Sequence, residues 1–387
     1  MHMKKAACSA AAAFAAVSLA VAAPEIEVVS SSQNVATRAV TVTYNLSEEA
    51  AVVTFVAQTN NGVEWVDIGT ANLKNFDGEV NRLVAVGNNH TATWHPDKSW
   101  PNHKVTGGNF RVGLKAWATN APPDYMVIDL GIRPASVRYY EAEDALPFAI
   151  TDNVAKQDYL VMRKCHGAGV TWRMGSPVGE PGRGTGETAH NVTFTKDFYV
   201  GVYPVTHRQY ALMTGGTGTE SQWRFPQSNV SYGDFQNTLA SVNSTREISL
   251  RSPTEAEWEF ACRAGAGTAY YNGSNDSSTA GDISWNSGNS GGARNDVGLK
   301  TGNDWGFYDM LGNVWEFCSD WYDANYGCDA EDVTDPTGGT SATSHVLKGG
   351  FYNTAASGVR CAARSGSSNA QNAAWGFRLA ADAMALR

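Results

Sequence analysis

The sequence predicts an α+β protein of two domains, an antiparallel β-sandwich followed by a larger domain with few regular elements. Three observations lead to this prediction. The chain has 387 residues, a usual length for two domains. Its N-terminal third alternates apolar and polar residues in short runs. The rest is rich in glycine and tryptophan, of which the chain has 39 and 12, and this composition is typical of loops packed around aromatic side chains.

The first 22 residues have the pattern of a secretory signal peptide. Lys4 and Lys5 precede a small apolar run, and Ala20-Val21-Ala22 has the form of a cleavage site. A membrane anchor is the alternative, but the run is short and alanine-rich for a spanning helix. No other segment is apolar enough to span a bilayer. We therefore expect an exported protein, either periplasmic, on the cell surface or extracellular.

Residues 24–140 are expected to form the β-sandwich. The runs AVTVTYNL, AAVVTFVAQ, NFRVGLKAWA and YMVIDLGI are strand-like, and turn signals such as Asn60-Asn61-Gly62 separate them. This arrangement favours a fibronectin-like or immunoglobulin-like fold. A linker near residues 140–150 then leads to the second domain, residues 150–387.

One helix is well signalled, in the segment LRSPTEAEWEFACRAG. Ser252 is the expected N-cap, Pro253 the first helical residue, and Glu255 the partner in a capping box. Gly265 is a suitable end. The spacing predicts one inward face made of Trp258, Ala261 and Cys262.

The net charge and the cysteine content limit the functions that are possible for this protein. The net charge is −9 and no long basic run occurs, which argues against a nucleic-acid partner. Without the signal peptide the chain keeps an odd number of cysteines, so at least one stays free or pairs outside the chain. These cysteines are Cys165, Cys262, Cys318, Cys328 and Cys361.

Five sequence blocks follow one another between Tyr159 and Asp382. They are WRMGSP, KDFYVGVYPVTHRQY, SPTEAEWEFACRAG, GFYDMLGNVWEFCSDWY and GG...RCAARS...WGFRLA. Together they resemble the formylglycine-generating enzyme family, also called the sulfatase-modifying-factor family. The resemblance implies an irregular fold related to C-type lectins, and it does not extend to the N-terminal domain.

The resemblance also implies an oxidase that converts a cysteine of a client sulfatase to formylglycine with copper and oxygen. That chemistry needs two cysteines between the GG and RCAARS motifs, since a thiolate pair suits Cu(I). No cysteine lies between Gly350 and Arg360. We therefore predict no copper site and assign no catalytic residue. An oxidase role for Cys361, or one with an unrecognised cofactor, remains the alternative.

For Cys361, the resemblance implies a disulfide with Cys262. Closing a loop of about 100 residues would stabilise the protein by roughly 4 to 5 kcal/mol in the chain-entropy model, less any strain. A reactive thiol and a buried unpaired cysteine are the alternatives. Cys318 and Cys328 form a second candidate disulfide, and Cys165 is expected to be a buried thiol.

The segment LGNVWEF resembles a calcium-binding turn of the family. Asn313 and Glu316 would supply side-chain oxygens, and Leu311 and Val314 would supply main-chain carbonyls. The alternative is that Asn313 caps a turn while Glu316 pairs with an arginine.

The C-terminal loop region is the candidate ligand surface, because in lectin-like relatives it lines the binding cleft. A solvated loop is the alternative. Hydroxyl and amide groups around an aromatic ring would suit a peptide, protein or glycan. The candidate residues are Ser357, Ser365, Ser367, Asn369, Asn372 and Trp375. The sequence thus favours an exported, non-catalytic binding protein. The alternatives are a formylglycine-generating oxidase and a structural surface component.

Overall fold

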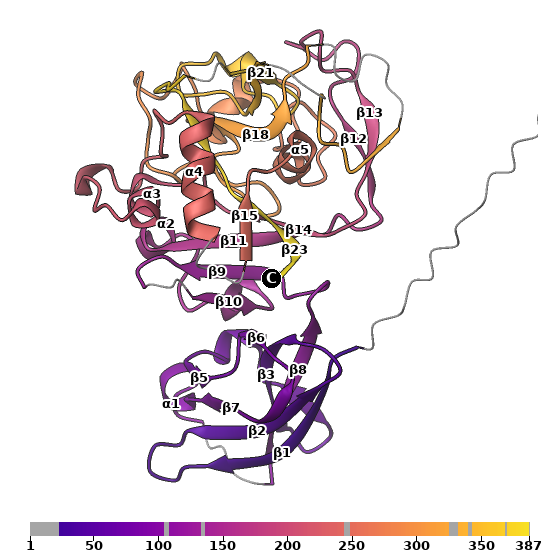
Figure 1. Cartoon of the computed structure of the whole chain (residues 1–387), viewed down its shortest axis with the longest axis vertical. Coiled ribbons are helices and arrows are strands. Elements are labelled where there is room, and N and C mark those ends of the chain that lie inside the picture. Colours follow the sequence, from indigo (N-terminus) through magenta and orange to yellow (C-terminus); the bar gives the residue numbers. More distant parts are fainter. Residues whose placement is uncertain are drawn as a thin grey trace, which may run out of the picture.

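The computed structural model describes residues 23–103, 108–132, 136–243, 248–324, 332–339, 343–367 and 370–386. It has an α+β fold, in which a small β-sandwich adjoins a larger domain of short strands and long connections (Figure 1). The predicted signal peptide, Cys328 and Asn369 lie outside the described residues.

Two antiparallel sheets form the N-terminal sandwich, as predicted. One sheet has the order β1-β2-β7-β5, and in the other β3 pairs with β8 on one edge and with β4 and β6 on the other. The strands are β1 (Glu25–Gln33), β2 (Val40–Ser47), β3 (Ala51–Asn60), β4 (Trp65–Asp67), β5 (Phe76–Gly78), β6 (Arg82–Val84), β7 (Gly87–Trp94) and β8 (Phe110–Ala118). Alternation along β2 buries Val42 and Tyr44 against Phe55 and Trp94.

The second domain begins earlier than residue 150. Strands β9 (Tyr125–Asp129) and β10 (Val137–Tyr140) lie within the range 24–140 that we expected to form the sandwich, yet they pair into the sheet β10-β9-β11-β14-β23-β15. The first four residues of β9 are all buried rather than alternately buried. A continuous apolar run of this kind suits a strand covered on both faces. The connection between the domains therefore follows β8.

The remaining strands of the second domain are short and belong to several sheets. The six-stranded sheet is completed by β11 (Tyr159–Cys165), β14 (Phe198–Gly201), β15 (Ile248–Arg251) and β23 (Ala380–Leu386). A second sheet contains β12 (Thr171–Met174), β13 (His190–Thr193) and β19 (Val333–Thr334), and β16 (Ser284–Trp285) pairs with β17 (Leu311–Gly312). A four-stranded sheet has the order β21-β20-β18-β22. Its strands are β18 (Trp315–Trp321), β20 (His345–Lys348), β21 (Arg364–Gly366) and β22 (Trp375–Phe377).

Helices are few and mostly short in the described residues. The α-helices are α1 (Pro96–Ser99), α2 (Asn153–Gln157), α3 (His207–Thr214), α4 (Tyr232–Asn243) and α5 (Glu255–Arg263). Among the residues that the structure describes, no helix has the length and apolar character needed to cross a membrane.

Helix α5 is the predicted helix, but it begins two residues later than expected. Thr254 is the N-cap, and its capping box closes with Glu257 instead of Glu255. Ser252 is buried and its hydroxyl accepts a hydrogen bond from Gln236, so it is engaged outside the helix. The predicted inward face is confirmed, since its three residues are fully buried: Trp258, Ala261 and Cys262.

The two domains share apolar and polar contacts. Val52 of β3 belongs to the same core as Met126 and Ile128 of β9. Beside it, the Thr54 hydroxyl donates a hydrogen bond to Glu141 at 2.5 Å. The sandwich is therefore packed against the sheet of the second domain.

Candidate functional site

The segment that the family resemblance marks as catalytic is a tightly held loop. Ser287 N donates to Thr354 O at 2.9 Å, and Ser290 Oγ donates to Tyr352 O at 2.8 Å. Gly349 and Gly350 open the loop at φ +91° and +78°. A Cβ on either would lie 2.7 Å from a neighbouring atom, so this turn requires glycine.

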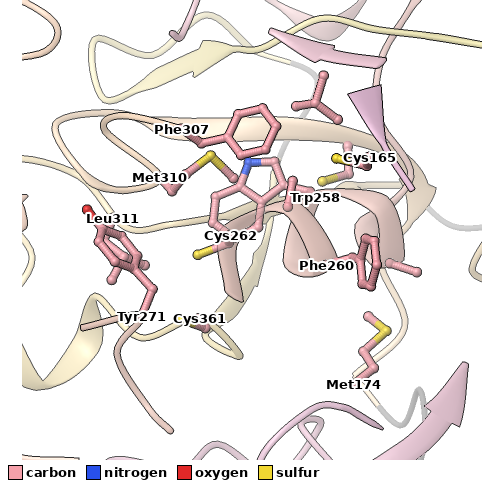
Figure 2. Packing of buried hydrophobic residues seen from close by; sticks show 14 of the residues in the cluster. Cys165, Met174, Trp258, Phe260, Cys262, Tyr271, Phe307, Met310, Leu311 and Cys361 are labelled. Carbon is pink, nitrogen blue, oxygen red and sulfur yellow. The ribbon is translucent and has the colours of Figure 1, made fainter. Parts of the chain in front are cut away.

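Cys361 follows this loop and lies beside Cys262 of α5, in the core around Trp258 (Figure 2). Both cysteines are fully buried thiols in the structure. The Cys262 thiol donates a hydrogen bond to Cys361 and, with nearby Arg263, lowers the pKa of Cys361. Burial and the same contact raise the pKa of Cys262. The structure thus brings the predicted pair together, while the disulfide itself stays a prediction.

The other cysteines are also inaccessible where the structure describes them. Cys318 on β18 is fully buried, Cys165 on β11 is 1% exposed, and burial raises the pKa of both thiols. The Cys318–Cys328 disulfide stays a prediction because Cys328 lies outside the described residues. All four described cysteines therefore lie in the core, and none of their thiols is exposed at the surface.

The expected calcium turn has its side-chain oxygens engaged by protein donors. Glu316 Oε1 accepts a hydrogen bond from Arg378 at 2.9 Å, and Oε2 accepts from Arg378 at 3.0 Å and from Trp258 at 2.6 Å. Asn313 Oδ1 accepts from Asn295 N at 3.1 Å. This matches the alternative in which Glu316 pairs with an arginine. A guanidinium beside the carboxylate would repel a cation, so Glu316 in this arrangement does not fit a calcium ligand.

No other metal cluster is evident in the described part of the chain. There, no three His, Cys, Asp or Glu side chains lie together as a set that could hold a metal ion. Leu311 and Val314, the expected carbonyl ligands, are buried on either side of Asn313.

A buried network of charges anchors α5 to the four-stranded sheet. Lys348 Nζ lies 2.9 Å from Glu259, which also pairs with Arg263 at 2.8 Å. One turn earlier, Glu255 pairs with Arg364 at 2.7 Å. Sequence reasoning did not find this network. Its only sequence signal is the i, i+4 spacing of Glu255 and Glu259 on one face of the helix.

The predicted ligand residues do not form one surface. Ser365 on β21 and Trp375 on β22 occupy opposite edges of the sheet β21-β20-β18-β22, about 14 Å apart at the usual strand spacing. Ser367 is 1% exposed and exchanges hydrogen bonds with the backbone of His345, so it is structural. Ser357 and Asn372 are exposed, and Trp375 is half-buried against Phe317. Asn369 lies outside the described residues.

A cleft that sequence reasoning missed lies at the N-terminal end of α5. Its volume is about 460 Å³, within the range of about 300 to 1,000 Å³ that is usual for ligand sites. Residues from six separate segments of the domain line it, so no short sequence motif marks it. They include Phe194, Phe198, Tyr232, Arg251, Glu257 and Asp382.

Comparisons with known proteins agree on one family and fold for the second domain. The model of the sulfatase-modifying factor enzyme 1-like domain matches residues 168–383. The mouse formylglycine-generating enzyme is 36% identical over 147 residues, which cover 34% of this chain and 39% of that protein. A protein of Chlamydia trachomatis named serine/threonine-protein kinase Pkn1 is 29% identical over 53% of this chain and 37% of its own length. The chain thus spans well under half of these two relatives.

One solved structure supports the fold. It is the Treponema denticola variable protein 1, which is 22% identical with a TM-score of 0.51 and covers 58% of this chain and 95% of that protein. At this identity the likeness concerns the fold alone.

Proposed function

The chain belongs to the family of the sulfatase-modifying factor enzyme 1-like domain, and from this premise we propose that it is an exported binding protein rather than an oxidase. One observation carries the proposal. The segment Gly349–Ser365 contains a single cysteine, Cys361, and that thiol is buried against Cys262.

The side chains present in this segment argue against copper chemistry. Between Gly350 and Arg360 the residues that can donate electron pairs are Tyr352, Asn353, Thr354 and Ser357. Neutral oxygen donors of this kind bind Cu(I) poorly, because a soft ion prefers thiolates. A client cysteine would also need to reach a protein thiol, and the described thiols are 0 to 1% exposed.

The same loop is well suited to present exposed side chains on a rigid backbone. A backbone hydrogen bond from Ser287 N and a side-chain hydrogen bond from Ser290 Oγ tie it to residues 287–290, and Asn353 and Ser357 remain exposed on it. The exposed Asn372 and the half-buried Trp375 provide a second patch at the β22 edge of the four-stranded sheet. We propose that one of these patches contacts a peptide, protein or glycan through amide, hydroxyl and ring groups.

Oxidase activity is the first test. The purified exported protein would be titrated with Cu(I) against a competing chelator and assayed for oxygen consumption with a cysteine peptide. The Thermomonospora curvata formylglycine-generating enzyme is the positive control. We expect neither tight copper binding nor loss of the peptide thiol. Formation of formylglycine in the peptide would refute the proposal.

Binding is the second test. The protein would be applied to peptide and glycan arrays, and hits would be measured again in solution with N353A, S357A and N372A. Loss of affinity in the first two variants would place the site on the loop, and loss in N372A would place it at the β22 edge. The control is Lys98→Ala, an exposed change in the sandwich. Full retention of affinity in all three variants would contradict both patches.

A further inference from the structure

We propose that the cleft at the N-terminal end of α5 binds a cationic side chain of a basic peptide. This cleft lies apart from the family segment Gly349–Ser365, and no residue of that segment lines it. The inference therefore holds or fails independently of the oxidase question.

The cleft combines an apolar floor with a charged rim. Phe194 and Phe198 are buried beneath it, and Tyr232 of α4 forms one wall. Tyr232 is held in place by stacking on His345, with ring centroids 3.5 Å apart. A fixed aromatic wall next to carboxylates suits a group with an aliphatic stem and a positive head.

The cleft carries excess negative charge. Its carboxylates outnumber its cations, which are Lys196 and Arg251. The lining carboxylates are Asp197, Glu257, Asp335 and Asp382. At neutral pH the lining thus has a formal charge of about −2, and a cation is the favoured ligand.

Arg251 cannot serve as an anion site, because all five of its N–H groups are already used. It donates two hydrogen bonds to Glu257, at 2.6 and 2.7 Å, and two to Asp382 Oδ1, at 2.6 and 2.9 Å. The fifth goes to Ser252 O at 3.1 Å. This ion-pair network fixes the carboxylates at the rim rather than offering a positive charge to the cleft.

One lining carboxylate keeps an oxygen open toward a ligand, as far as the described residues go. Asp382 uses only Oδ1 for Arg251, and its side chain is 52% exposed. Asp197 adds negative charge beside it, but both of its oxygens have partners, since Oδ1 accepts from Ala168 N and Oδ2 lies 3.9 Å from His166. The two residues belong to neighbouring segments, since β14 pairs Phe198 with Asp382 on β23. The open oxygen of Asp382 can accept charge-assisted hydrogen bonds from a guanidinium or ammonium group.

A metal ion is a poorer occupant than an organic cation. No described set of three acidic, cysteine or histidine side chains lies together as a metal site would require. The apolar floor would add nothing to a metal ion, whereas it would cover the methylene groups of an arginine or lysine side chain.

The test compares two peptides that differ only in charge. Acetyl-Gly-Arg-Gly-amide and its citrulline counterpart would be titrated into the full protein by NMR or calorimetry, at low and high salt. We expect the arginine peptide to bind and added salt to weaken its binding. The citrulline peptide should bind at least about tenfold more weakly.

Matched variants locate the binding. Asp382→Asn should weaken arginine-peptide binding about fivefold or more, whereas Asp282→Asn, an equal charge change at the exposed end of a 3-10 helix outside the cleft, should leave it unchanged. Because D382N alters the Arg251 network, Thr337→Trp on the exposed rim provides a second variant that fills the cleft without changing charge. Equal weakening by D282N would show diffuse attraction to an acidic protein. That result would overturn the proposal. So would equal affinity for the citrulline peptide, or no binding of the arginine peptide.

Discussion

Glu316 and Arg378 form a two-point ion pair in the core of the second domain, with side-chain exposures of 1% and 0%. The pair joins β18 to the segment after β22, and Trp258 of α5 donates a further hydrogen bond to the same carboxylate. The buried carboxylate of Glu316 thereby links three elements that are distant in sequence.

Removing one partner of this pair should be costly. We expect Arg378→Met to lower the free energy of unfolding by about 3 to 5 kcal/mol, because it leaves a buried carboxylate without its cation. The double variant E316Q/R378M should be less destabilised than the sum of the two single variants. Urea unfolding measures both effects. Strictly additive losses would argue against coupling between the two residues.

An exposed ion pair provides the control for this experiment. Arg38 and Asp97 lie 3.2 Å apart, with side chains 54% and 50% exposed. Arg38→Met should change stability by no more than about 0.5 kcal/mol, because solvent screens the pair.

Asp320 should make stability depend on pH near neutrality. Burial, and then the charge of Glu255, raise the pKa of Asp320 to about 7. The folded protein therefore takes up a proton between about pH 7 and 4 before the unfolded chain does, and stability gains from this group as pH falls through that window. Asp320→Asn removes the buried charge. The stability of the variant relative to the native protein should therefore be highest at pH 8 and lowest near pH 4.

Thermal unfolding of both proteins across this pH range measures the effect. The informative quantity is the difference in Tm, since other groups titrate equally in both. The amide oxygen of the variant can still accept the hydrogen bond that Asp320 takes from Glu255 N at 2.8 Å. A difference that does not change with pH would contradict the raised pKa of Asp320.

Calcium should have little effect on the turn LGNVWEF, residues 311–317. Because Arg378 occupies both oxygens of Glu316, we expect neither added calcium nor a chelator to shift the Tm of the protein. Differential scanning calorimetry in calcium and in chelator is the measurement. A rise in Tm with calcium that Asn313→Ala abolishes would restore the calcium site expected from the sequence.

The Cys262–Cys361 disulfide is expected to form when the protein is exported. The two thiols already share a hydrogen bond in the core, and linking them would close a loop of about 100 residues, stabilising the fold by roughly 4 to 5 kcal/mol before strain. Alkylation of the unreduced protein followed by peptide mapping should recover the two cysteines as one linked peptide. If both are recovered as separate alkylated peptides, the pair is a reduced thiol pair in the native protein.

Local patterns were sufficient for several features of this protein. Alternation in the segment Val40–Ser47 predicted a strand, and the i, i+3, i+4 spacing of Trp258, Ala261 and Cys262 predicted their burial. Such features depend on neighbours a few residues apart, so the sequence displays them directly. The ordered motifs likewise indicated the family and its fold, and the absence of cysteine between Gly350 and Arg360 is readable from the sequence alone.

Other features were decided only by tertiary structure, because they depend on which distant segments meet. Whether Glu316 paired with an arginine or was free to bind a metal ion depended on Arg378, 62 residues away. Ser365 and Trp375 are near in sequence, yet strand order places them at opposite edges of one sheet. The pairing of β9 with β11 places β9 in the second domain, so the boundary lies earlier than expected. The cleft exists only because β14, β23 and the start of α5 converge. Strand pairing and buried charge are long-range interactions, and no local pattern specifies their partners.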